Sequence, residues 1–124
     1  MAGKYTLRLE HHFDAAQKLR LDYASPCQNV HGHRWDVVIE IVSNRLDKCG
    51  MVCDFKVIKG FVNELDHKML NEVVDFNPTA ENISKYLHDK IKREVVGEVK
   101  VTIFESPGAS ITYEDTETEE DTDL

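Results

Sequence analysis

Hydrophobic and polar residues alternate along three stretches of the chain. In each stretch the apolar positions share one parity, and mostly polar residues lie between them. The three apolar sets are Tyr5, Leu7, Leu9, Phe13 and Ala15, then Trp35, Val37, Ile39 and Ile41, then Val99, Val101 and Ile103. Because successive side chains of a strand point to opposite faces, each stretch is predicted to be a β-strand with one face in water.

The hydrophobic period changes to that of a helix in the middle of the chain. One stripe, spaced by three and four residues, predicts a first helix over residues 55–69 with Asp54 as its N-cap. Its members are Phe55, Ile58, Val62, Leu65 and Met69. A second helix is outlined by Ile83, Leu87 and Ile91, and either Asn77 or Thr79 could cap it. His88 faces away from that stripe and is expected to lie in water.

A Pro-Gly turn follows the third strand and leads into "SITYE", a short fourth strand. The order of elements is therefore ββααββ. This order predicts an α+β fold, an antiparallel sheet with two helices on one face. Such a sheet has two open edges, and pairing them with neighbouring copies would remove an aggregation hazard. We therefore expect a homo-oligomer.

Negative charge is concentrated at the end of the chain. The last eleven residues hold seven of the 23 acidic residues and no basic one, which leaves 16 acidic against 15 basic residues elsewhere. Residues 114–124 are predicted to be a disordered acidic tail, with docking to a basic partner as the alternative. Residues 1–113 are predicted to form a single domain, as a length of 124 residues suggests.

Composition argues against several classes of function. The chain has no basic stripe for nucleic acid, no apolar run long enough to span a membrane, and no signal peptide. A cytoplasmic location is the expectation. Cys27, Cys49 and Cys53 are an odd number of cysteines, which a reducing compartment would keep as thiols.

Two histidines could share a metal ion. Only Gly32 separates His31 from His33, so in an extended chain both side chains point the same way. Zinc favours imidazole, and a catalytic zinc typically keeps three protein ligands and an open position. The pair therefore indicates half of a metal site, and the alternative is an ordinary turn with two exposed histidines.

Three further residues are candidates for proton transfer. Cys27 precedes the histidine pair, and a thiol beside a cation can act as a base or nucleophile at neutral pH. Alone, it could also be a small buried residue. Asp66 and His67 are neighbours, and such a couple can hold an imidazole in one tautomer. Adjacent residues do not face each other on a helix, so their contact would need a helix end or a loop.

Glu105 continues the parity of Val101 and Ile103, which places a carboxylate on the face expected to be buried. A buried carboxylate needs a partner. That partner is either a basic residue of the chain or a ligand with two adjacent N–H donors.

Six short motifs, in one order, resemble a known family. They are "FDAA", C-x₃-HGH, "VCDF", "LDHKMLN", "NPTAEN" and "FESP". Together they resemble the 6-pyruvoyltetrahydropterin synthase family, and most closely its 6-carboxytetrahydropterin synthase branch, which acts in the queuosine pathway. The resemblance runs from about Tyr5 to Tyr113 and covers nearly the whole chain except the acidic tail.

The resemblance implies the tunnelling fold, in which ββααββ subunits join their sheets into a barrel in a trimer and two trimers stack as a hexamer. Its active sites would lie between subunits. His31 and His33 would bind zinc, Cys27 would be the catalytic thiolate, and Asp66 with His67 the proton relay. For the pterin ring, it implies contacts from Glu105 and Thr79.

The reaction implied by the resemblance converts 7,8-dihydroneopterin triphosphate into 6-carboxy-5,6,7,8-tetrahydropterin with loss of acetaldehyde and triphosphate. Zinc would polarise the side-chain hydroxyls of this substrate. Lys18, Arg20 and Lys68 are candidates to bind its triphosphate.

The chain departs from the family at position 17. The family has a histidine, its first zinc ligand, at the end of "FDAAH", where this chain has Gln17. An amide oxygen is a poorer zinc ligand than imidazole. Gln17 could be a weak ligand, an introduced change that traps a bound pterin, or the mark of a paralogue with lost or changed chemistry. The alternatives to the synthase are therefore a pterin-binding protein without turnover, and an enzyme with dihydroneopterin aldolase or pyruvoyl-forming activity.

Overall fold

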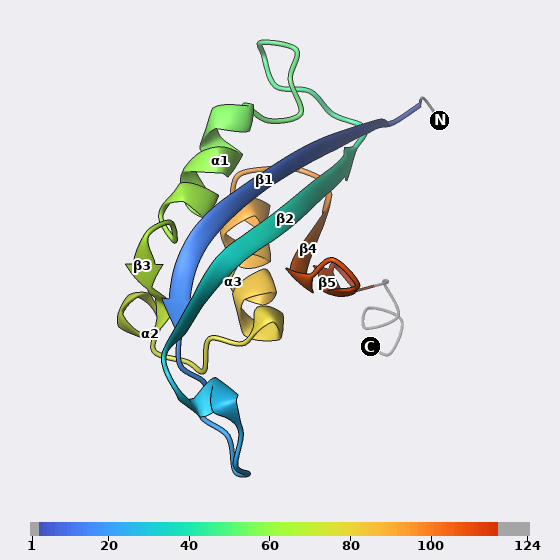
Figure 1. The fold of residues 1–124 in the computed structure, drawn as a ribbon. Helices are drawn as coiled ribbons and strands as arrows, with labels where there is room; N and C mark the ends of the chain where they lie inside the picture. The colour runs from blue at the N-terminus through green and yellow to red at the C-terminus, as the bar shows by residue number, and fades with distance from the viewer. Residues whose placement is uncertain (1–2, 117–124) are drawn as a thin grey trace.

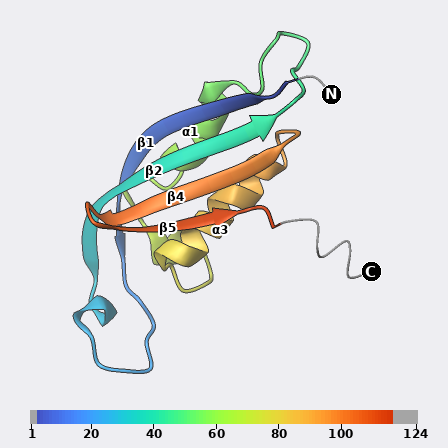
Figure 2. The same cartoon turned by 90° about the vertical axis from the view of Figure 1, so that its right-hand side faces the viewer.

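The computed structural model describes residues 3–116. A five-stranded sheet has the order β3-β1-β2-β4-β5. The strands are β1 (Tyr5–Gln17), β2 (His31–Ser43), β3 (Lys68–Met69), β4 (Glu98–Ser106) and β5 (Ala109–Glu114), and the helices are α1 (Phe55–Asn63), α2 (Leu70–Val73) and α3 (Ala80–Lys92). The helices lie on one face of the sheet (Figure 1), as predicted, and the other face is open (Figure 2).

The four long strands pair antiparallel, as their order along the chain predicts. In the β1–β2 ladder, Tyr5 lies opposite Ser43 and Gln17 lies opposite His31. β4 pairs with β2 on one side and with β5 on the other. The short strand β3 was not predicted, and it pairs parallel with β1 at Ala15 and Ala16.

The core lies between the helices and the covered face of the sheet. It contains the predicted apolar positions of β2 and β4, and those of β1 from Leu9 to Ala15. Phe13 and Trp35 are fully buried, and their rings stack with centroids 5.4 Å apart. Large side chains buried in this way each contribute about 1.5–3 kcal/mol by leaving water. The α+β prediction is therefore confirmed, and the packing fixes which face of each strand is open.

The prediction of one helix over residues 55–69 was wrong. α1 ends at Asn63, and a turn follows that keeps Leu65 buried. His67 then adopts a left-handed backbone conformation with φ 58°, which a helix cannot contain. Leu65 therefore packs into the core from a turn, and Met69 belongs to β3.

Thr79 rather than Asn77 caps α3, because its hydroxyl accepts a hydrogen bond from the backbone N–H of Asn82 over 3.1 Å. His88 was expected in water but is only 6% exposed. Its two ring nitrogens contact carboxylate oxygens of Asp89 and of Asp115, which follows β5. These two carboxylates satisfy the buried imidazole.

Residues 117–124, most of the predicted acidic tail, lie outside the described residues. Glu114 is the last residue of β5, and Asp115 also pairs with Lys92 of α3. In residues 3–116, no helix has the length and apolar character needed to cross a membrane.

Candidate functional site

The two histidines and Gln17 share one face at the end of the β1–β2 ladder. Gln17 lies directly opposite His31, and Ala15 lies opposite His33. Directly opposite residues in an antiparallel pair point to the same face. The His31 and His33 rings are nearly parallel, with centroids 6.2 Å apart, and His33 stacks on Trp35 at 4.7 Å. The core thus orients both imidazoles.

Backbone carbonyls fix which nitrogen of each imidazole is free. Nδ1 of His31 lies 2.8 Å from the carbonyl oxygen of Asn29, and Nδ1 of His33 lies 2.9 Å from that of Arg34. A carbonyl only accepts, so each Nδ1 must donate. In the neutral form of each ring, the lone pair is then on Nε2, which is the arrangement usual for metal-binding histidines.

Gln17 contributes a buried oxygen without a partner. Its side chain is 2% exposed, and its Oε1 has no hydrogen bond within the described residues. A buried polar atom left unpaired costs about 1–3 kcal/mol. Two imidazoles and an orphaned amide oxygen are a donor set that can hold a divalent cation such as zinc, although the amide is the weakest of the three.

Asp66 and His67 contact each other in the turn after α1. Nδ1 of His67 lies 2.9 Å from Oδ2 of Asp66. The backbone N–H of Asp14 lowers the pKa of Asp66, against the opposing effect of burial, and His67 lowers it further. The Asp66 carboxylate therefore stays ionised and holds the Nδ1 proton. Nε2 of His67, whose side chain is 81% exposed, remains free to exchange a proton.

Asp14, Asp66 and His67 also form a compact group. One carboxylate oxygen from each aspartate and one ring nitrogen lie within 4.8 Å of one another. Both oxygens of Asp66 already accept hydrogen bonds, one from Asp14 and one from His67. Those bonds make the group a poor cation site and a better proton relay.

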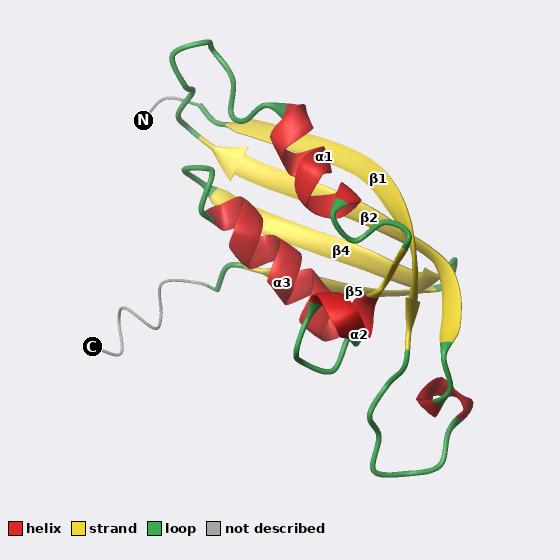
Figure 3. Ribbon diagram, turned by 90° about the vertical axis from the view of Figure 1, so that its left-hand side faces the viewer, coloured by secondary structure: helices red, strands yellow, loops and turns green. Residues whose placement is uncertain are grey.

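Cys27 lies in a short 3₁₀ turn, Pro26–Gln28, within the loop between β1 and β2. It is half-buried, its N–H donates to Oγ of Ser25 over 3.2 Å, and its carbonyl accepts from Leu19 over 2.8 Å. Figure 3 shows this loop extending past the end of the sheet. Within the described residues of one chain, the structure records no contact of Cys27 with Asp66 or His67.

Two asparagines anchor the loop that carries Cys27, and sequence reasoning missed both. Asn71 donates to the carbonyl of Lys18 and accepts from its N–H, each over 2.9 Å. Asn77 makes the same pair of bonds with Arg20, each over 2.8 Å. Both asparagines belong to motifs that carry the family resemblance, "LDHKMLN" and "NPTAEN". Their place in these motifs was the one sign in the sequence that the two asparagines matter to the site.

The expectation that Glu105 is buried was wrong for the single chain. Glu105 is exposed, because the β4–β5 register shifts between Phe104 and Ser106 and the β2–β4 ladder ends at Phe104. The bulge takes the carboxylate out of the alternation that the prediction assumed. Thr79, the other predicted ring contact, uses its hydroxyl to cap α3.

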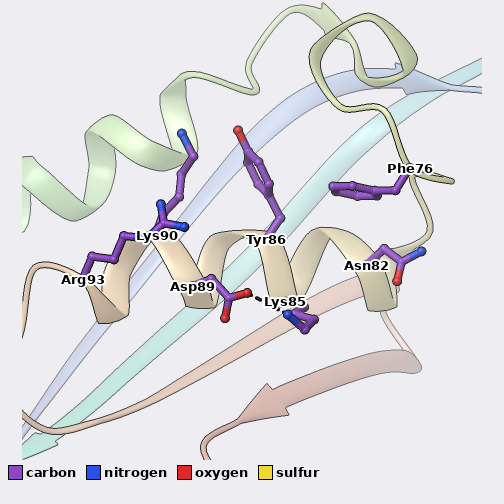
Figure 4. A pocket seen from close by; sticks show the side chains of 7 residues that line it. All are labelled: Phe76, Asn82, Lys85, Tyr86, Asp89, Lys90 and Arg93. Atoms are coloured by element: carbon purple, nitrogen blue, oxygen red, sulfur yellow. Dashed lines mark hydrogen bonds and ion pairs between the residues drawn. The ribbon is translucent and has the colours of Figure 1, made fainter.

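Two of the hollows have no lining residue in common. One, of about 500 Å³, is lined by residues that include Asp14, His33 and His67, and therefore brings a candidate metal ligand and the candidate relay to one space. The other, of about 360 Å³, follows α3 (Figure 4). There Phe76 and Tyr86 form an aromatic wall, and neither hollow's lining includes Cys27.

Comparison with known proteins agrees with this architecture. The structure superposes on 6-pyruvoyl tetrahydropterin synthase of Caenorhabditis elegans with a TM-score of 0.70 and 25% identity, covering 92% of this chain and 97% of that one. The fold is therefore the tunnelling fold of pterin synthases. Residues 6–116 match the 6-pyruvoyl tetrahydropterin synthase family, and the chain belongs to this family of enzymes.

Individual relatives differ in activity. A 6-carboxy-5,6,7,8-tetrahydropterin synthase of Rickettsia bellii is 31% identical, over 87% of this chain and 97% of its own length. A dihydroneopterin monophosphate aldolase of Pyrococcus furiosus is 38% identical, over 72% of this chain and 76% of its own. The first bears out the resemblance to the 6-carboxytetrahydropterin branch. The second shows that a protein named as an aldolase is also similar to this chain.

Proposed function

We propose that this chain is a 6-carboxy-5,6,7,8-tetrahydropterin synthase. Its substrate is 7,8-dihydroneopterin triphosphate, which with water yields 6-carboxytetrahydropterin, acetaldehyde and triphosphate. The observation that carries the proposal is the Asp66–His67 contact of 2.9 Å, a proton relay in the turn after α1 of this fold. Relatives named for this activity support it.

Gln17, His31 and His33 would hold the metal ion, with zinc as the proposed metal. The support is the orphaned Oε1 of Gln17 beside two imidazoles whose Nδ1 atoms are already bound. When bound, zinc would supply Lewis-acid polarisation of substrate hydroxyl groups.

The remaining candidates have roles in proton transfer. Asp66 holds the Nδ1 proton of His67, so Nε2 of His67 can take a proton from the pterin side chain and return it later. Cys27 is the second acid or base. Because one chain does not bring Cys27 to His67, we propose that a second copy supplies one of them in a homo-oligomer built through the sheet edges. Such an oligomer removes the open edge of β5 and the part of the β1 edge that the short strand β3 leaves unpaired.

Glu105 and Thr79 are proposed to bind the pterin ring. Glu105 lies at the end of the sheet, beside the bulge, with its carboxylate exposed. Docking of another copy at this end would bury the carboxylate, and the amino and ring N–H groups of a pterin would then give it two donors side by side. This small-molecule chemistry needs neither nucleic acid nor a membrane, and a cytoplasmic enzyme is proposed.

A second candidate activity is aldolase cleavage of a dihydroneopterin. The relative from Pyrococcus furiosus favours it. Here the bond between the first and second carbons of the side chain breaks, which leaves a 6-hydroxymethyl-dihydropterin and a two-carbon aldehyde.

Product analysis distinguishes the two activities. The purified protein, loaded with zinc, is incubated with 7,8-dihydroneopterin triphosphate and separately with the monophosphate, and the pterins are separated by chromatography. 6-Carboxytetrahydropterin with one equivalent of acetaldehyde would support the synthase. A hydroxymethyl product would support the aldolase, and no product from either substrate would leave a pterin-binding protein, which fluorescence titration with a pterin would detect.

A further inference from the structure

Asp14 holds the Asp66–His67 pair from two sides. Its backbone N–H donates to Oδ1 of Asp66 over 2.8 Å, and its carbonyl accepts from the backbone N–H of His67 over 2.6 Å. Directly after Asp14, β1 pairs with β3 at Ala15 and Lys68. The turn that carries the relay is thereby fixed to β1 as well as to α1.

This attachment maintains an unfavourable backbone conformation. His67 has φ 58°, and the left-handed region costs a non-glycine residue about 1–2 kcal/mol. Such conformations persist where the surroundings over-determine them, and they cluster at functional sites. Here the conformation lets two residues adjacent in sequence meet through their side chains, which a helix does not allow.

The side chain of Asp14 is the unexplained part of the group. Its carboxylate lies within 4.8 Å of both Asp66 and the His67 ring, yet it has no hydrogen bond or ion pair within residues 3–116. Arg34 lies opposite Asp14 in the β1–β2 ladder, but it pairs with Asp36 over 2.8 Å. Two carboxylates therefore lie beside one imidazole, and that of Asp14 has no hydrogen-bond or ion-pair partner among the described residues.

We infer that Asp14 is a positioning residue of the proton relay: its backbone sets the Asp66–His67 geometry, and its carboxylate stabilises the positive charge that His67 gains in turnover. The inference rests on the proposed function. In the step concerned, Nε2 of His67 takes a proton from the substrate while Nδ1 keeps its own, so the ring goes from neutral to singly positive. A negative charge within 4.8 Å favours that charged form.

The other charges around His67 are mostly positive. Lys68 of β3 and Arg34 of β2 line the same hollow, and His12 of β1 contributes to lowering the pKa of Asp66. These groups oppose the positive charge that the imidazole gains. Asp14 and Asp66 are the carboxylates that offset these positive charges, so loss of the Asp14 charge should lower kcat.

The variant Asp14→Asn isolates this effect, because it keeps both backbone contacts and removes only the charge. The matched control is Glu10→Gln, which removes a carboxylate from the same face of the same strand, about 13 Å away. We expect kcat of Asp14→Asn to fall roughly 10- to 100-fold with KM changed about threefold at most, and the pH profile of kcat to be displaced. Glu10→Gln should match the wild type, and thermal unfolding should show both variants folded.

Two outcomes would overturn the inference. One is an Asp14→Asn enzyme with the kcat and pH profile of the wild type. The other is an unchanged ¹⁵N NMR signature of the His67 ring, compared between wild type and Asp14→Asn at fixed pH without substrate. The NMR comparison does not need turnover. If the wild type converts neither pterin substrate, the proposed function fails, and a changed ring signature still supports the role of Asp14.

Discussion

Gln17 and His31 lie directly opposite each other across β1 and β2, and the amide oxygen of Gln17 is buried there without a hydrogen-bond partner. An alanine or leucine would avoid the cost of an unpaired oxygen at this position, whereas a metal ion would satisfy it. The relationship makes position 17 the most informative place to test the metal site.

The variant Gln17→His should bind zinc more tightly. A third imidazole replaces a weak amide donor, and we expect an affinity gain of at least about tenfold. Zinc per chain after dialysis, and competition with a chelator, measure the change. Gln28→His is the control, because it adds an imidazole in the loop outside the ladder. Equal zinc affinity in the wild type and Gln17→His would show that position 17 is not a ligand position.

Asp66→Asn should slow turnover and leave the fold intact. The carboxylate holds the Nδ1 proton of His67, and an amide at this place can favour the wrong tautomer. We expect kcat to fall roughly 10²- to 10⁴-fold, the range of general acid–base catalysis. Steady-state kinetics give the loss, and circular dichroism checks the fold. Wild-type kcat in this variant would remove Asp66 from the relay.

Asn77→Ala should release the loop that carries Cys27. The substitution removes the two hydrogen bonds to Arg20, each of which contributes about 0.5–1.5 kcal/mol. Hydrogen exchange at the amides of Leu19 and Arg20 should accelerate, and kcat should fall because Cys27 is no longer held in place. Asn44→Ala, at an exposed asparagine after β2, serves as the control. Unchanged exchange in Asn77→Ala would show that the loop is held by other contacts.

Acid should weaken the attachment of the segment after β5 to α3. Burial tends to raise the pKa of Asp115, but Lys92 and His88 outweigh it and leave the pKa lowered from 3.8. The native state then binds fewer protons than the unfolded state, so this contribution is complete above pH 3.8 and is lost as pH falls below it.

The melting temperature of the wild type should therefore fall steeply below about pH 4, and that of Asp115→Asn less steeply. Asp22→Asn, at an exposed position in the β1–β2 loop, is the control and should follow the wild type. Parallel curves for wild type and Asp115→Asn would mean that this carboxylate has the same proton affinity in both states.

Alternation and helical spacing predicted the four long strands, α3 and the start of α1, because burial of one face imposes those periods. The same reasoning failed where a local contact overrides the period. Leu65 fits a helical stripe yet lies in a turn, since α1 ends at Asn63 and the left-handed His67 prevents a helix from continuing to Met69. Glu105 fits a strand parity yet is exposed, since a bulge removes it from the ladder. His88 faced away from the apolar stripe yet is buried, because the carboxylate of Asp115 is its hydrogen-bond partner. Asp115 is far from His88 in the sequence, so helical spacing could not reveal this contact.

The candidate site shows the same division. Spacing alone placed His31 and His33 on one face, and the β1–β2 ladder shows that Gln17 shares this face. The hydrogen bonds of Asn71 and Asn77 to the loop could not be derived from the hydrophobic periodicity, because each joins segments more than fifty residues apart. The metal-binding, proton-transfer and ring-binding roles assigned to the residues of this site all remain predictions.

Asn71 and Asn77 hold the loop through the main chain of Lys18 and Arg20 alone. The side chains at positions 18 and 20 are therefore free to change by mutation without loosening the anchor. A substitution at either position changes the charge that the loop presents while the loop keeps its path. Anchoring through the backbone thus separates the path of this loop from the chemistry of its side chains.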